Sequence, residues 1–254
     1  MAKLLVIGID GATWKIIKPH LSELPNFQNL MKTGESKSLF VEDVVLSAAI
    51  WCTIFSGKST KEHGHEKYVV NENLQLRDDI AVDFIWDVLD KKYDVKALQV
   101  PFVMPPYNFN CTYDPVGYGV SSDLNELKED MDNLASRSLE LLKNNLDIFI
   151  VVFGMLDKLQ HFHWGEPIIL EWYKKIDKIL GTLIEYGEKL IIISDHGFCS
   201  RGEARIQTLP DKNNKGESLK GDHHEEAILI TKNINYEINH HKDVFNVILK
   251  EINH

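Results

Sequence analysis

Three aspartates in the sequence each follow an apolar run that is typical of a buried β-strand. The runs are LLVIGID, which ends at Asp10, IFIVVFGMLD, which ends at Asp157, and LIIISD, which ends at Asp195. Side chains at the ends of neighbouring strands converge in space even when they are far apart in the sequence, and open sheets bind ligands at that edge. We therefore expect the three carboxylates to lie together in the active site of an enzyme.

The segments that must position these aspartates alternate between strand and helix patterns. Runs typical of strands lie at 4–9, 39–46, 95–100, 148–153, 190–194 and 227–231. Patterns typical of helices lie at 26–32, 49–55, 82–91, 123–144, 167–186 and 244–252. Alternation of this kind predicts an α/β fold, in which a mostly parallel central sheet has helices on both faces. We expect one domain that spans residues 1–254.

Two stretches, 101–119 and 198–220, lack any regular periodicity. Both follow predicted strands, so both could border a site at the same edge of the sheet. For each stretch, an ordinary surface loop without a role in a site is an equally good interpretation.

The composition is that of a globular protein, with 254 residues of which 44% are hydrophobic and 26% are charged. The formal net charge of −10 argues against a nucleic-acid polymer or an anionic membrane as the main partner, because both attract clustered Lys and Arg. A small molecule is the expected ligand. The sequence does not indicate the oligomeric state.

The cysteines and the apolar segments favour a cytoplasmic location. Cys52, Cys111 and Cys199 share no CxxC spacing and cannot all pair, so a reducing compartment is the simpler interpretation. The N-terminal apolar run is too short for the core of a signal peptide, and no segment approaches the roughly 18 apolar residues of a membrane span.

Six blocks of the sequence resemble the type I phosphodiesterase / nucleotide pyrophosphatase group of the alkaline phosphatase superfamily. In the order of that family they are IGIDGATW, LPNFQNLMKTG, SAAIWCTIFSGKSTKEHG, LDKLQHFHW, ISDHGF and GDHHEEAIL. The resemblance covers nearly the whole chain. It implies an alkaline phosphatase-like three-layer sandwich, with a minimal cap because large insertions are lacking, and it implies hydrolysis of a small phosphate ester.

The resemblance also implies two divalent metal ions, usually zinc, with manganese as an alternative. By motif position, the ligands of one metal are Asp157, His161 and His223, and those of the other are Asp10, Ser47, Asp195 and His196. Mixed carboxylate and imidazole ligands suit zinc or a similar first-row ion. Asp157 and His161 are four residues apart, so a helical turn would place them on one face.

Ser47 is the predicted nucleophile. Family members place a Ser or Thr nucleophile ten residues before the Gly of a TG or SG pair, and Gly57 closes such a pair here. Taken alone, Ser47 would be interpreted as a helix cap. A hydroxyl attacks poorly unless a base or a metal stabilises its alkoxide form. If Ser47 is itself a metal ligand, the metal provides this stabilisation directly.

Two further residues are candidates for substrate contact. Tyr68 lies five residues after His63, where nucleotide pyrophosphatases usually carry an Asn that contacts a phosphate oxygen, and this departure leaves the choice between a diester and a monoester open. His224 follows the ligand of the family motif GxHxxxGIL, at a position where the family often has Arg. It either contacts substrate or faces solvent.

A monoesterase of the same superfamily is expected to supply positive charge near the phosphate. The sequence offers Lys58, Lys61, Arg201 and Arg205 for this purpose. The histidines outside the motif positions, which are expected at the surface, are His20, His65, His163, His240, His241 and His254.

The remaining alternative is a metal- or nucleotide-binding protein without catalytic activity. The presence of all seven motif residues disfavours this alternative. A dinucleotide-binding module is also disfavoured, because GIDGAT departs from the GxGxxG pattern after the first strand.

Overall fold

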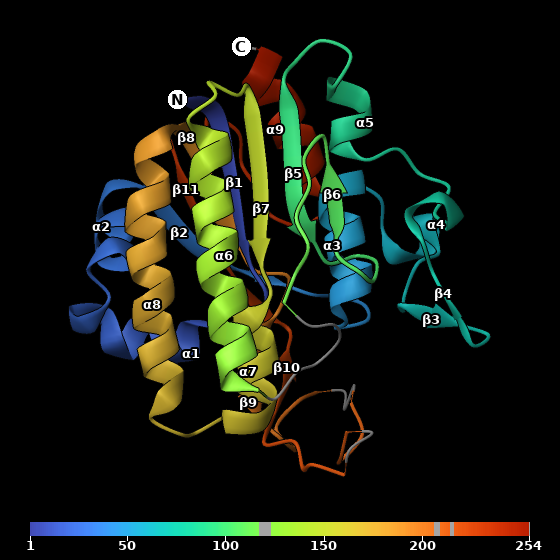
Figure 1. Ribbon diagram of the computed structural model, residues 1–254, viewed down its shortest axis with the longest axis vertical. Coiled ribbons are helices and arrows are strands. Elements are labelled where there is room, and N and C mark those ends of the chain that lie inside the picture. Colours follow the sequence, from blue (N-terminus) through green and yellow to red (C-terminus); the bar gives the residue numbers. More distant parts are fainter. Residues whose placement is uncertain (117–122, 206–208, 214–215, 254) are drawn as a thin grey trace.

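The computed structural model describes residues 1–116, 123–205, 209–213 and 216–253. Its centre is a seven-stranded sheet in the order β2-β11-β8-β1-β7-β5-β6 (Figure 1). The strands are β1 (Ala2–Ile9), β2 (Glu35–Phe40), β5 (Val95–Val100), β6 (Tyr107–Phe109), β7 (Ile148–Phe153), β8 (Gly187–Ile193) and β11 (Glu226–Lys232).

The middle of the sheet is parallel and its two margins are antiparallel. β1 pairs in parallel with β7 on one side and with β8 on the other, and β7 pairs in parallel with β5. β11 and β6 run antiparallel to β8 and β5, and β2 runs antiparallel to β11. The predicted mostly parallel sheet is therefore confirmed.

Helices cover both faces of the sheet, as expected for a three-layer sandwich (Figure 1). The first layer contains α1 (Trp14–Ile17), α2 (Pro25–Thr33), α6 (Leu124–Leu142), α7 (Met155–His163) and α8 (Ile168–Leu183). The second contains α3 (Ser47–Ser56), α5 (Ile85–Leu89) and α9 (Asp243–Asn253). Shorter elements are α4 (Thr60–His63) and the strand pairs β3 (Val69–Val70) with β4 (Asn73–Leu74) and β9 (Gly197–Ser200) with β10 (Gly221–His224).

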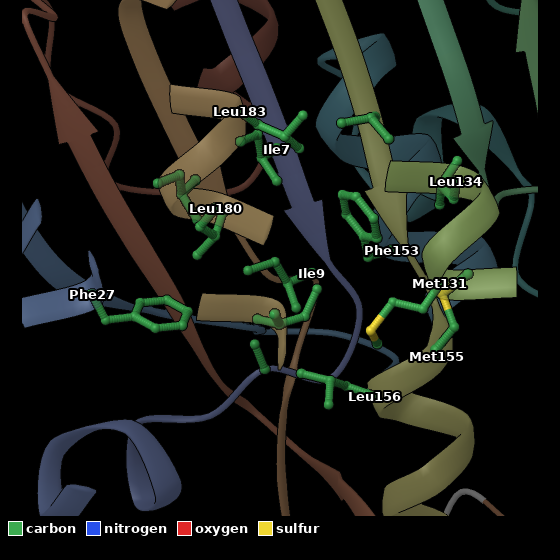
Figure 2. Packing of buried hydrophobic residues seen from close by; sticks show 14 of the residues in the cluster. Ile7, Ile9, Phe27, Met131, Leu134, Phe153, Met155, Leu156, Leu180 and Leu183 are labelled. Atoms are coloured by element: carbon green, nitrogen blue, oxygen red, sulfur yellow. The ribbon is translucent and has the colours of Figure 1, made fainter. Parts of the chain in front are cut away.

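Strand β1 is apolar throughout because both of its faces are buried. Leu5 and Ile7 pack on the layer that contains α8, whereas Leu4 and Val6 pack on the layer that contains α3. Figure 2 shows the first of these clusters, in which Ile7 lies beside Leu183 of α8.

Two predicted elements differ from the structure. A strand was expected at 39–46, but β2 spans Glu35–Phe40, because an edge strand pairs through its backbone and its outward side chains can be polar. The helix expected at 82–91 is limited to α5, where Phe84 is extended and the carboxylate of Asp87 accepts its N–H at 2.9 Å. The short strand pairs had no periodic signal in the sequence.

None of the helices in the described ranges combines the length and the apolar character that crossing a bilayer requires.

Gly8 sits where β1 meets α3, and a side chain at this position is expected to destabilise the protein. A Cβ atom there would lie 2.6 Å from Cη2 of Trp51 and 2.8 Å from Cγ2 of Val152. Gly8→Ala should therefore lower the free energy of unfolding by about 1–3 kcal/mol through overpacking, as measured by urea denaturation.

The matched control is Gly154→Ala, because a Cβ atom at Gly154 would meet no atom within 4 Å. This control should change the free energy of unfolding by less than about 1 kcal/mol. Equal effects of the two substitutions would contradict the tight packing of Trp51 on β1.

Candidate active site

The three aspartates lie at the carboxyl ends of adjacent parallel strands. Asp10 directly follows β1, Asp195 follows β8 after Ser194, and Asp157 lies in the first turn of α7, which starts just after β7. Because β8, β1 and β7 are neighbours, their carboxyl ends meet at one edge of the sheet, at the bottom of the view in Figure 1. The expected convergence of the three carboxylates is observed.

The four remaining motif side chains lie at the same edge. One turn of α7 separates His161 from Asp157, and His223 is on β10, which pairs with β9. His196 lies between β8 and β9, and Ser47 is the first residue of α3. The side chains of all these residues are buried or nearly so.

One group of converging atoms consists of Asp157, His161 and His223. Oδ1 of Asp157 lies 3.2 Å from Nε2 of His161 and 3.2 Å from Nε2 of His223. The two Nε2 atoms are themselves 3.2 Å apart. Nδ1 of His223 lies 2.8 Å from the carbonyl oxygen of Val45, which keeps the proton on Nδ1 and leaves the Nε2 lone pair free for a ligand.

A second group surrounds His196. Its Nε2 atom lies 3.2 Å from Oγ of Ser47, 3.3 Å from Oδ2 of Asp195 and 3.7 Å from Oδ1 of Asp10. Its Nδ1 atom faces the carbonyl oxygen of Gly197 at 2.9 Å, so this ring also directs Nε2 toward the cluster. The two groups adjoin, because the same Nε2 atom is 3.9 Å from Oδ1 of Asp157.

The unpaired carboxylate oxygens show that this donor set fits metal ions. Oδ2 of Asp10 accepts the indole N–H of Trp51 at 3.1 Å, and Oδ1 of Asp195 accepts the N–H of Gly11 at 3.2 Å. Oδ1 of Asp157 and Oδ2 of Asp195, in contrast, are buried and accept no hydrogen bond of good geometry from the described residues, although ring nitrogens of His161, His223 and His196 lie 3.2–3.3 Å away. Such atoms are costly unless a cation compensates them. Two groups of residues each bring their ligand atoms within 4.8 Å of one another. One group is Asp157, His196 and His223, and the other is Asp10, Asp195 and His196.

The pKa shifts follow from the crowding of buried charge. Burial and the neighbouring carboxylates of Asp195 and Asp157 raise the pKa of Asp10 well above its usual value. Burial and Asp157 raise the pKa of Asp195 to about 7. Burial and His223 lower the pKa of His196 well below its usual value. Burial opposes the ionisation of Asp157 as well, but His161 and His223 lower its pKa well below the usual value, and Asp157 in turn raises the pKa of His223 against the effect of burial. The site thus combines a readily ionised Asp157 with two carboxylates, those of Asp10 and Asp195, whose ionised forms need a compensating positive charge.

A cavity of about 430 Å³ opens beside this cluster. Asp10, Ser47, Asp157, His161 and His223 form its polar end. Its apolar lining includes Leu46, Pro101, Met104, Pro106, Met155 and Leu209. Both stretches without periodicity therefore contribute to the wall of the site, although residues 117–119, 206–208 and 214–215 within them lie outside the described residues.

The two predicted substrate contacts differ in position. Tyr68 lines the cavity, and its hydroxyl donates to the carbonyl oxygen of Pro101 at 2.8 Å. Burial and the nearby carboxylates raise the pKa of this hydroxyl well above its usual value, against the opposing effect of a hydrogen bond with Ser47. His224 is not among the residues that line the cavity, and its Nδ1 atom accepts the N–H of Glu226 at 3.1 Å.

The cations that line the cavity are not the expected ones. Arg201 binds Asp211 and the carbonyl oxygen of Leu209, and Arg205 lies 3.8 Å from Glu225. Lys67 and Lys158 line the cavity instead. The only sequence signal for Lys158 was its position directly after Asp157.

Two histidines that were expected at the surface are buried. Nε2 of His65 bonds to the carbonyl oxygen of Phe102, and Nε2 of His241 lies 3.2 Å from the carbonyl oxygen of Ser194. Backbone carbonyl partners allow these imidazoles to be buried without a metal. His163 is partly exposed and pairs with Glu166, and His254 lies outside the described residues.

The type I phosphodiesterase / nucleotide pyrophosphatase family matches residues 4–243. The chain belongs to this family. It is therefore a hydrolase of the phosphodiesterase and pyrophosphatase type, and metal dependence is typical of such enzymes. None of the curated proteins matches the sequence.

Solved structures share the fold of this family member at low sequence identity. Human ectonucleotide pyrophosphatase / phosphodiesterase 5 has a TM-score of 0.68 and 14% identity over 99% of this chain and 95% of its own. An inactive variant of the murine protein in complex with AMP has a TM-score of 0.65 and 15% identity over 100% of this chain and 95% of its own. Phosphonoacetate hydrolase from Sinorhizobium meliloti in complex with phosphonoformate has a TM-score of 0.70 and 10% identity over 99% of this chain and 96% of its own.

Zinc binding to the metal-free protein at pH 6.5 is expected to release protons. With a pKa of about 7, Asp195 is mostly protonated at this pH, and it must lose that proton to become a ligand. The release from Asp195 should decline as the pH rises through 7, because the proton is then already absent. Calorimetry in buffers of different ionisation enthalpy measures the number of protons that are released per zinc ion bound. A number that does not change between pH 6.5 and 8.5 would contradict this account.

Proposed function

We propose that this hydrolase holds two divalent metal ions, zinc with manganese as the alternative, and cleaves phosphate esters through a covalent intermediate on Ser47. The proposal rests on one observation above all. Oγ of Ser47 lies 3.2 Å from Nε2 of His196 and donates to Oδ1 of Asp10 at 3.4 Å, inside the cluster with the unpaired carboxylate oxygens.

The proposed metal ligands divide between the two groups of converging atoms. Asp157, His161 and His223 would hold one ion, and Asp10, Ser47, Asp195 and His196 would hold the other. Two such ions supply positive charge for the attacking, leaving and non-bridging oxygens, and they lower the pKa of a bound hydroxyl.

The side chains of this chain then perform a two-step substitution at phosphorus. Oγ of Ser47 releases its proton to solvent and forms a bond to phosphorus, while the leaving ester oxygen departs with the electron pair of its bond and takes up a proton from solvent. The oxygen of a water molecule then forms a bond to phosphorus as the Oγ–phosphorus bond breaks, and a proton of that water restores the serine hydroxyl. Ser47 starts α3, a ten-residue helix, so free backbone N–H groups near it favour a phosphate oxygen.

Tyr68 is the proposed contact to a phosphate oxygen, in place of the Asn that nucleotide pyrophosphatases usually carry. Its hydroxyl cannot ionise readily and so keeps its proton, and in this proposal it turns from the carbonyl oxygen of Pro101 to donate to the phosphate oxygen. His224 has no contact with substrate in this proposal, because it lies outside the cavity lining.

A phosphodiester or a pyrophosphate is the proposed substrate class. The largely apolar cavity next to the cluster offers room for an organic substituent on phosphorus. The AMP complex of the murine neighbour is consistent with a small nucleotide-like ligand. A monoester is the second candidate, because Lys67 and Lys158 line the same cavity and could compensate the additional negative charge.

A cytoplasmic location stays a prediction. It is supported by the three cysteines, which are all free thiols in the structure.

Diester preference is tested by comparing kcat/KM on bis(4-nitrophenyl) phosphate with that on 4-nitrophenyl phosphate. The zinc-loaded protein should favour the diester by at least about tenfold, because only the diester places a substituent in the apolar cavity. The same comparison with manganese shows which ion supports turnover. A monoester preference would move the assignment to the second candidate, and no turnover with two ions bound would favour a binding protein.

Replacement of a proposed ligand should remove one metal ion and the activity together. Asp195→Ala is expected to lower kcat/KM by roughly a thousandfold or more and to halve the bound zinc, because its buried carboxylate has no substitute. Elemental analysis and kinetics measure the two effects. His163→Ala is the matched control, since His163 lies on the same helix as Asp157 and its side chain pairs with Glu166 rather than with the cluster. Near-normal rates in the Asp195 variant would overturn the metal assignment.

A further inference from the structure

The side-chain amide of Gln99 is an unpartnered polar group in the wall of the cavity. Gln99 is only 5% exposed and it lines the cavity from the end of β5. Its Nε2 atom is buried without a hydrogen-bond partner among the described residues. A buried amide is costly unless it is paired, so this one requires an explanation.

A β-bulge places this amide in the cavity. Ala97 pairs with Phe109 and Val100 with Tyr107, so two residues of β5 lie opposite the single residue Asn108 of β6. Oδ1 of Asn108 accepts the backbone N–H of Gln99 at 2.9 Å, and Nδ2 of Asn108 donates to the carbonyl oxygen of Tyr113 at 3.0 Å. Asn108 therefore holds the bulge in one conformation.

The bulge changes the direction of one side chain. In a regular strand Ala97 and Val100 would face opposite sides of the sheet, yet both pack against the helix layer that contains α3. The extra residue is Gln99, whose φ of 58° is in the left-handed region. Glycine adopts this conformation without strain and is the usual residue at such a bulge. A long polar side chain at this position, in a residue that lines the cavity, indicates a role for the side chain itself.

The surroundings of the amide restrict what it can bind. Pro101, Met104 and Pro106 line the cavity from the segment that follows β5, and Met155 lines it from α7. Tyr68, Asp130 and Lys158 line the same cavity, but Gln99 contributes a neutral amide beside these apolar residues. Such an amide selects ligands by their hydrogen-bonding edge, since a ligand without that edge leaves the amide unpaired.

We propose that Gln99 is a specificity-determining residue, which hydrogen-bonds an amide-like edge on a mainly apolar substituent of the substrate's phosphorus. An amide offers one donor and one acceptor, and rotation by 180° exchanges them, so an adjacent donor and acceptor on the ligand satisfy both. Pyrimidine rings carry such an edge. This inference rests on the proposed function, because it assumes that the cluster beside the cavity binds the phosphate.

The test uses two diesters that share the 4-nitrophenolate leaving group. Thymidine 5′-(4-nitrophenyl phosphate) carries an imide edge, and phenyl 4-nitrophenyl phosphate carries none. The zinc-loaded protein should prefer the thymidine ester. In Gln99→Met, which keeps the length of the side chain without its amide, the ratio of the two kcat/KM values should fall about tenfold, with the phenyl ester changed by less than about twofold.

A second variant separates specificity from folding. Gln99→Gly relieves the left-handed backbone, so its Tm should equal or exceed that of the parent while the substrate ratio falls as in Gln99→Met. Asn233→Gly is the matched control, because Asn233 also has a φ of 58° but does not line the cavity. Its substrate ratio should be that of the parent protein.

An unchanged ratio in both Gln99 variants, or no preference for the thymidine ester in the parent protein, would overturn the inference. Failure of the proposed function gives a different result, namely no turnover of either ester by the zinc-loaded parent. Calorimetric binding of thymidine 5′-monophosphate then decides the role of Gln99. About tenfold weaker binding by Gln99→Met supports it, and equal binding refutes it.

Discussion

The crowding of three buried carboxylates at one edge of a parallel sheet is the constraint on which the rest of the site depends. Asp10, Asp157 and Asp195 converge because the three strands before them are adjacent and point the same way. Burial and mutual repulsion raise the pKa of Asp10 and Asp195, and two carboxylate oxygens accept no hydrogen bond of good geometry from the described residues. A bound cation would relieve this cost, which ordinary packing could not.

The surrounding structure directs imidazole Nε2 atoms into the same small volume. The carbonyl oxygens of Val45 and Gly197 engage the Nδ1 atoms of His223 and His196, so each Nε2 atom faces the carboxylates. Backbone groups of this kind fix the ring orientation before any ligand arrives. The family match spans residues 4–243, and the residues of the cluster come from nearly the same length of the chain, from Asp10 to His223.

Beside the charged cluster the fold supplies a surface of opposite character. The segments after β5 and β9 contribute apolar side chains such as Met104 and Leu209, so the site has one ionic end and one apolar wall. Gln99 interrupts that wall at a bulge, where an irregular backbone rather than regular alternation determines the direction of the side chain.

Much of the fold and the central cluster was determined by the sequence alone, whereas the substrate-facing wall was decided by tertiary structure. Apolar runs such as 148–153 are long enough to predict a buried parallel strand, and an aspartate after each run must lie at its end. The strand pair that carries His223 and the bulge at Gln99 leave no periodic signal, because they depend on cross-strand partners such as Phe198 and Asn108. Likewise, burial of His65 and His241 required carbonyl partners from distant segments, and composition cannot reveal which carbonyl a folded chain brings near.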